Sequence, residues 1–77
     1  MIYERVKEIL SNELEVPIEE IDYKSNLFDD LGASSIDLVD LAMSVEDEFG
    51  IEVPDELLET VQTVEDVVNF IEDNSGE

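Results

Sequence analysis

Two adjacent serines, Ser34 and Ser35, follow Gly32 and precede an acidic segment with helically spaced apolar residues in "DDLGASSIDLVDLAMSVEDEFG", residues 29–50. A serine hydroxyl becomes a nucleophile only beside a general base, and usually beside an oxyanion hole. The chain contains no histidine and no cysteine, and its two lysines, Lys7 and Lys24, lie outside this run. Self-activation of either serine is therefore not expected, and any chemistry at these hydroxyls has to be performed by another enzyme.

The spacing of Ser34 and Asp37 distinguishes the two hydroxyls. S-x-x-D directly before an apolar-periodic run is typical of a capping box at a helix N-terminus. In this register Ser34 is the N-cap, and Ser35 occupies the first helical position with its hydroxyl free to point outward. A phosphate on Ser35 would lie at the positive end of the helix. The simpler alternative is that both serines only cap and solubilise the helix end.

The predicted helix after the serines carries two apolar stripes. At about 100° per residue, one sector contains the expected core residues Leu38, Leu41, Ala42, Val45 and Phe49. A second sector contains three apolar residues flanked by carboxylates. A small bundle can bury such a wide stripe, but apolar side chains framed by acids also suit a partner with a Lys/Arg patch. The candidate partner-binding residues are Ile36, Asp37, Val39, Asp40, Met43 and Asp47.

The charge of the chain is strongly one-sided, with 23 acidic residues, three basic residues and a net charge of -20. The bases Arg5, Lys7 and Lys24 all lie in the first third of the sequence. Such a field repels nucleic acid and anionic membranes, and it favours basic partner surfaces. Self-repulsion also predicts that stability rises with salt or divalent cations. No calcium-loop motif occurs, so we expect no dedicated metal site and only weak surface binding of hard cations.

The remaining patterns predict a soluble, cytoplasmic, single-domain protein over residues 1–77. No apolar run approaches the length of a membrane span, and the N-terminal "MIYERVKEIL" does not have the pattern of a signal peptide. The fold class is all-α, a small four-helix bundle with three main helices, one short helix and a long packed loop between the first two helices. Residues 74–77 are expected to form a frayed tail.

Local signals place the four helices. The first covers residues 2–15 and is ended by Pro17, and the second extends from the serines to Phe49 with Gly50 as its stop. Pro54 is expected in the first turn of the short third helix. A second capping box, Thr63 with Asp66, begins the fourth helix, whose buried stripe is Val64, Val67, Val68 and Ile71. The long connection is expected to pack on the core through Ile18, Ile21, Leu27, Phe28 and Leu31.

The stretch around the serines resembles the acyl carrier protein family. The signature of that family is an acidic residue, Leu-Gly, two further residues, and a serine followed by an apolar residue at the start of an acidic helix. The matching residues here are Asp30, Leu31, Gly32, Ser35, Ile36 and Asp37. The resemblance covers nearly the whole chain, including "FGIEVPDE" and "TVEDVVNFI" in its second half.

This resemblance implies a carrier protein that is a substrate of other enzymes and not itself an enzyme. Ser35 would be esterified to 4'-phosphopantetheine, taken from coenzyme A by a magnesium-dependent phosphopantetheinyl transferase. The thiol of that arm would carry growing acyl chains as thioesters between the enzymes of fatty-acid biosynthesis. The second helix would be the docking surface for basic patches on these enzymes, and the acyl chain would retreat between the helices of a monomer.

Ser34 departs from the family pattern, because the fatty-acid members typically carry Asp there. The N-cap role survives this change, since Ser and Asp cap about equally well. Ser35 is preferred over Ser34 as the modified residue, because Ile36 must follow it to keep the family register. Two alternatives stay open: a specialised carrier of polyketide, aminoacyl or D-alanyl groups, and an acidic non-enzymatic adaptor protein.

Overall fold

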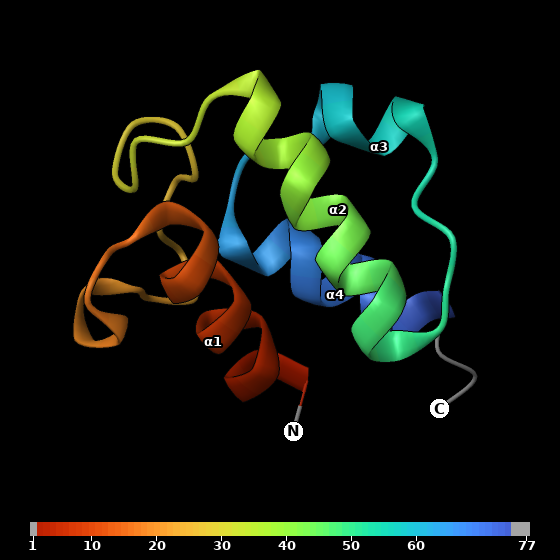
Figure 1. The fold of residues 1–77 in the computed structure, drawn as a ribbon, viewed down its shortest axis with the longest axis horizontal. Helices are drawn as coiled ribbons and strands as arrows, with labels where there is room; N and C mark the ends of the chain where they lie inside the picture. Colours follow the sequence, from red (N-terminus) through yellow and green to blue (C-terminus); the bar gives the residue numbers. More distant parts are fainter. Residues whose placement is uncertain (1, 75–77) are drawn as a thin grey trace.

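The helices of the chain are connected by one long and two short segments, as seen in a computed structural model that describes residues 2–74 (Figure 1). The elements are α1 (Ile2–Leu14), a 3-10 turn η1 (Ile18–Glu20), α2 (Ser35–Phe49), α3 (Asp55–Thr60) and α4 (Val64–Asn74). Three main helices and one short helix confirm the predicted all-α, four-helix architecture. None of the helices within residues 2–74 is both long and apolar enough to cross a bilayer.

The ends of the helices follow the local signals closely. α2 begins at Ser35 behind the Ser34 cap and ends at Phe49, and its C-cap Gly50 adopts a left-handed conformation with φ 68°. α1 ends at Leu14, one residue earlier than predicted, and Glu15 takes the left-handed conformation with φ 57°. Pro54 is the N-cap of α3 and not part of its first turn. α4 includes Asn74, and the other residues of the predicted frayed tail, 75–77, lie outside the described residues.

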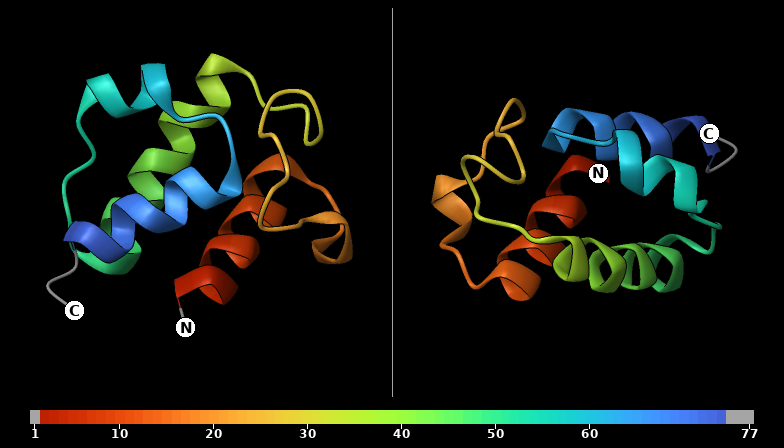
Figure 2. Two further views of the ribbon diagram at one scale, coloured as in Figure 1. Left: turned by 180° about the vertical axis from the view of Figure 1, so that it is seen from behind. Right: turned by 90° about the horizontal axis from the view of Figure 1, so that it is seen from above.

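The core lies where α1 packs against both α2 and α4, while α3 packs against α2 (Figure 2). The stripe predicted for α4 is buried in full. Ala42 and Phe49, expected on the core face of α2, are only half-buried, and Phe49 packs against the buried core. The buried apolar residues of the main helices are Val6, Leu10, Leu38, Leu41, Val45, Val64, Val67, Val68 and Ile71.

The long connection between α1 and α2 packs on the core with only part of its apolar residues. Ile21, Leu27 and Leu31 are buried, but Ile18 and Phe28 are 36% and 38% exposed, so the prediction was wrong for these two side chains. The reason for Phe28 is local. The Asn26 side-chain oxygen accepts the N–H groups of Phe28 and Asp29, each at 2.9 Å. Hydrogen bonds therefore hold this turn, which does not need the Phe28 ring in the core.

The same connection is bound to the start of α4. The N–H of Leu27 donates to the Gln62 carbonyl at 2.7 Å, and the N–H of Val64 donates to the Ser25 carbonyl at 3.0 Å. These bonds use main-chain donors and acceptors that a loop and a helix N-terminus would otherwise leave to water. They fix the segment that leads into α2 against a part of the chain nearly 40 residues away in sequence.

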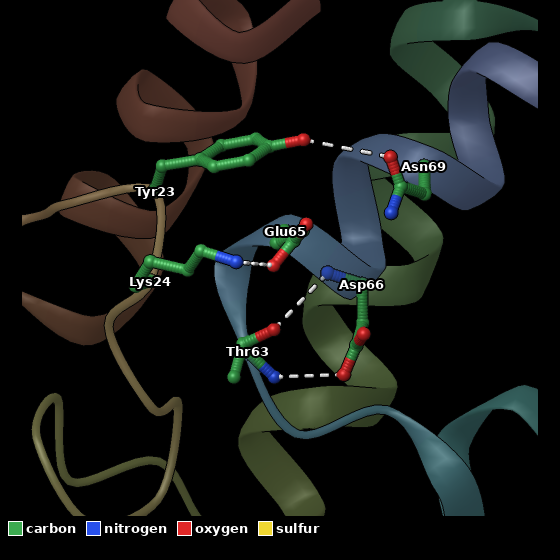
Figure 3. A network of polar contacts seen from close by, with 6 residues as sticks. All are labelled: Tyr23, Lys24, Thr63, Glu65, Asp66 and Asn69. Atoms are coloured by element: carbon green, nitrogen blue, oxygen red, sulfur yellow. Dashed lines mark hydrogen bonds and ion pairs between the residues drawn. The ribbon is translucent and has the colours of Figure 1, made fainter.

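Side chains reinforce this junction (Figure 3). The Lys24 ammonium lies 2.6 Å from a Glu65 carboxylate oxygen, and the Tyr23 hydroxyl lies 3.5 Å from the Asn69 side-chain oxygen. At the N-terminus of α4 the predicted capping box is confirmed: the Thr63 N–H donates to the Asp66 carboxylate at 3.1 Å, and the Asp66 N–H donates to the Thr63 hydroxyl oxygen at 3.2 Å.

Candidate functional site

The two serines at the start of α2 have different hydrogen-bond environments. The Ser34 hydroxyl oxygen accepts the N–H of Asp37 at 3.3 Å, and the Ser34 N–H donates to the Asp37 carboxylate at 3.0 Å. The predicted capping box is therefore present, with Ser34 as the N-cap. Ser35 is the exposed first residue of the helix, and no group within residues 2–74 forms a hydrogen bond with its hydroxyl.

The turn before the serines is held from both sides. The N–H of Ala33 donates to the Leu27 carbonyl at 2.8 Å, and the N–H of Gly32 donates to the Phe28 carbonyl at 3.1 Å. Gly32 has φ 73°, a left-handed conformation that costs a residue with a side chain about 1 kcal/mol or more. Since Leu27 is itself bonded to the start of α4, Ser35 is presented at the end of a fixed segment.

The second apolar stripe of α2 faces solvent. Ile36 is 75% exposed, Val39 is 49% exposed and Met43 is 59% exposed. This exposure confirms that the stripe is separate from the core face, and the alternative of one wide buried stripe is wrong. An exposed apolar row on a helix is a feature that marks interaction surfaces.

The carboxylates around this stripe keep their charge unpaired by cations. Asp40 and Asp47 are exposed, whereas Asp37 is half-buried because it takes part in the capping box. None of the ion pairs formed by residues 2–74 involves these three aspartates. The predicted α2 surface, Ile36, Asp37, Val39, Asp40, Met43 and Asp47, is thus apolar and anionic.

The three basic residues are occupied elsewhere in the described part of the chain. Arg5 pairs with Glu8 in its own helix at 2.8 Å and with Glu48 near the end of α2 at 2.6 Å. Lys24 pairs with Glu65 at the start of α4. Lys7 lies over the Tyr3 ring, 4.8 Å from its centroid. Arg5 and Lys24 therefore join different elements, and Asp37 and Asp40 in the first turns of α2 take part in none of the ion pairs among residues 2–74.

A small apolar cavity of about 30 Å³ lies beside the core face of α2. It is bounded by α2, α3, α4 and the segments next to α3, and every residue that lines it is apolar. Sequence reasoning assigned the α2 residues to the core but did not single out Val53 or Phe70, because an apolar side chain carries no sign of what it borders. The lining residues are Leu38, Leu41, Ala42, Val45, Val53, Leu57, Leu58, Val61, Val67, Phe70 and Ile71.

Comparison with known proteins agrees with the features of this site. Residues 4–71 match the family model described as "Phosphopantetheine attachment site". The chain is also 47% identical to the "Acyl carrier protein" of Clostridium acetobutylicum over 77 residues, the full length of both sequences.

Proposed function

Because the chain belongs to the acyl carrier protein family, we propose that Ser35 is the residue to which 4'-phosphopantetheine is attached. The observation that supports this choice is the division of roles between the two serines. Ser34 is committed to the cap through Asp37, while the Ser35 hydroxyl is exposed and free. A phosphodiester on Ser35 would also lie at the positive end of α2, where negative charge is favoured.

The 4'-phosphopantetheine arm would supply the thiol that this chain lacks. When bound, it provides a terminal thiol that carries acyl groups as thioesters from one enzyme to the next. The chain has no cysteine to provide such a thiol, and no histidine to activate Ser35. The protein's own contribution is to present Ser35 on a fixed turn and to offer a docking surface beside it.

The α2 surface is proposed as the docking site for the phosphopantetheinyl transferase and for the synthase enzymes. Ile36, Val39 and Met43 supply apolar area, and the flanking aspartates supply attraction to a basic patch. Complementary charge mainly raises the association rate and orients the partner. A carrier that visits many enzymes needs fast, reversible docking, and this surface combines a small apolar row with a strong field.

The cavity favours a hydrocarbon cargo and hence a role in fatty-acid biosynthesis. Burial of apolar surface stabilises a chain by about 0.8 kcal/mol for each methylene, whereas an aminoacyl or D-alanyl group would bring an ammonium into the cavity without a partner. Burying an unpaired charge is costly, and each of the lining residues is apolar. As part of the same proposal, the protein acts as a cytoplasmic monomer.

The test is the intact mass of the protein after incubation with coenzyme A, magnesium and a broad-specificity phosphopantetheinyl transferase. We expect one added phosphopantetheine unit in the wild type and in Ser34→Ala, and none in Ser35→Ala. Addition to Ser35→Ala but not to Ser34→Ala would move the attachment to the neighbouring serine. Absence of any mass gain with several transferases would favour the acidic adaptor instead.

A further inference from the structure

The apolar cavity beside α2 shares two of its lining residues with a second, larger space. Val53 and Phe70 line the 30 Å³ cavity, and they also line an open groove of about 690 Å³. The rest of that groove is formed by the end of α2, the segment after it and the end of α4, with Glu46, Gly50 and Asn74 among its residues. Val53 and Phe70 therefore stand between the cavity and the groove.

The residues of α2 that line the two spaces show which end of the cavity Val53 and Phe70 close; these two residues are called the partition below. The cavity is lined on α2 by residues from Leu38 to Val45, a rise of about 10 Å along the axis. On the same helix the groove is lined by Glu46, just beyond Val45. Ser35 lies at the opposite end of the helix, so the partition is at the far end of the cavity as seen from Ser35.

The two partition residues are held differently. The N–H of Val53 donates to the Glu46 carboxylate at 2.8 Å, which fixes the segment after α2 to the helix. Phe70 is a half-buried side chain of α4 that packs at the edge of the core. Of the two, the Phe70 ring contributes the larger barrier and is the one whose removal would join the cavity to the groove.

The volume of the cavity makes its end wall important. The cavity is small, about 30 Å³, so an acyl chain enters only when the side chains around it move apart. Each methylene that enters gains burial until the chain meets a wall that does not yield. Beyond that wall, further methylenes have to bend back or leave the core, and they add no burial.

We infer that Phe70, with Val53 beside it, is the end wall that sets the length of acyl chain the bundle can shelter. The inference rests on the proposed function, because it requires an acyl group carried from Ser35. It assigns Phe70 a role as a specificity-determining residue for chain length. The side chain acts by exclusion and does not contact the reacting thioester.

The experiment compares a series of acyl chains of increasing length, loaded from acyl-coenzyme A by a broad-specificity transferase and verified by intact mass. The melting temperature of each acylated form is measured against the form with the bare arm. In the wild type we expect the melting temperature to rise with chain length and then to reach a plateau. In Phe70→Ala the plateau should move to longer chains by about two methylenes or more, because the lost ring leaves a void larger than one methylene.

Phe49→Ala is the matched control. Phe49 is also a half-buried phenylalanine at the edge of the core, and it lines neither the cavity nor the groove. Its removal should lower all melting temperatures without moving the plateau. Phe70→Trp provides the opposite test in a variant that keeps the core filled, and its plateau should move to shorter chains. If Phe70→Ala does not fold, Phe70→Leu replaces it.

The outcomes separate the two proposals. A plateau at the same length in wild type and in the folded Phe70 variants would overturn the end-wall inference while leaving the carrier function intact. An equal displacement in Phe49→Ala would overturn it as well, since general loosening would then explain the change. A wild type whose stability does not depend on chain length would mean that the chain stays outside the bundle. Failure of the wild type to take up any arm, by mass, would instead reject the carrier function.

Discussion

The Ser34 hydroxyl oxygen and the Asp37 N–H form one half of a reciprocal pair, whose other half joins the Ser34 N–H to the Asp37 carboxylate. The pair satisfies two backbone donors at the start of α2 and fixes the residue next to Ser35. The two side chains of this pair contribute differently to the site. The serine only caps, whereas the carboxylate both caps and contributes charge to the α2 surface.

Replacing Ser34 tests how much its N-cap hydrogen bond contributes to stability. Ser34→Ala should lower the free energy of unfolding by about 1 kcal/mol, because the N-cap acceptor is lost. Ser34→Asp restores the acceptor and should remain within about 0.5 kcal/mol of the wild type. Both values come from urea unfolding followed by circular dichroism. Equal stability of Ser34→Ala and the wild type would show that the cap does not contribute in solution.

The C-terminal end of α1 offers a stabilising substitution. Glu15 has φ 57°, a conformation in which glycine is favoured over residues with a side chain. The Ser11 hydroxyl closes the same turn by donating to the Val16 carbonyl at 2.6 Å. Glu15→Gly should raise the free energy of unfolding by about 1 kcal/mol. Glu15→Gln is the control, because it removes the charge without changing the backbone preference. The difference between the two variants isolates the conformational contribution. If Glu15→Gly raised the free energy of unfolding no more than Glu15→Gln, the argument would be contradicted.

Glu15 also shows where prediction from the sequence reaches its limit. Pro17 correctly indicated that α1 ends nearby, but nothing in the sequence marked Glu15 as left-handed, since glycine or asparagine is the usual signal. By contrast, the ends marked by Gly50 and by the two capping boxes were predicted to the residue. Helix ends that depend on hydrogen bonds between residues close in sequence can therefore be predicted from the sequence.

The packing of the connection before α2 could not be predicted from the sequence in full. Phe28 looked like a core residue because it is large and apolar, yet the Asn26 turn leaves it 38% exposed. The bonds from Leu27 and Ser25 to the start of α4 are between main-chain atoms, so no side-chain pattern announces them. The exposure of Ile36, Val39 and Met43 was predictable, because helical periodicity alone places them off the core face.

The start of α4 predicts a pH effect. Hydrogen bonds from the backbone N–H groups of Gln62 and Thr63 lower the pKa of Asp66 below its ordinary value of 3.8. A lowered folded-state pKa means that the ionised carboxylate stabilises the fold above the unfolded pKa, and that this contribution is lost as pH falls through the folded pKa. The stability difference between wild type and Asp66→Asn should therefore be full near neutral pH and shrink below about pH 4.

The control for this effect is Asp73→Asn, which removes a charge from an exposed position of the same helix. Its stability difference from the wild type should lack the part due to the capping box. Unfolding curves in urea at a series of pH values measure both differences. A difference for Asp66→Asn that stays constant down to pH values well below 4 would contradict the assignment.

The net charge of -20 predicts a marked response to ions. Like charges on a small surface destabilise the compact state, and ionic strength screens them over a Debye length of about 10 Å at 0.1 M. The melting temperature should therefore rise with sodium chloride, and it should rise at lower concentrations of magnesium chloride. The measurement is differential scanning calorimetry at constant pH. A melting temperature that does not change with either salt would show that self-repulsion is not a significant term.

Charge reversal on α2 tests the proposed docking surface, and the structure indicates which aspartates to use. Asp37 is a poor choice because reversal would also remove half of the capping box. Asp40 and Asp47 are exposed and take part in none of the ion pairs among residues 2–74. Asp40→Lys and Asp47→Lys should lower kcat/KM for a phosphopantetheinyl transferase, mainly through slower association, and should weaken its dependence on salt.

The matched control is Glu72→Lys, which makes the same change of net charge at an exposed position of α4. If only the overall field mattered, all three variants would lose the same amount of kcat/KM. If the α2 surface is the docking site, the two α2 variants should lose about tenfold or more at low salt, the difference shrinking at high salt, while Glu72→Lys changes little. Unfolding curves of the three variants ensure that the comparison is made between folded proteins. Equal losses in all three would remove the α2 aspartates from the docking surface and leave its apolar row, Ile36, Val39 and Met43, as the remaining candidate.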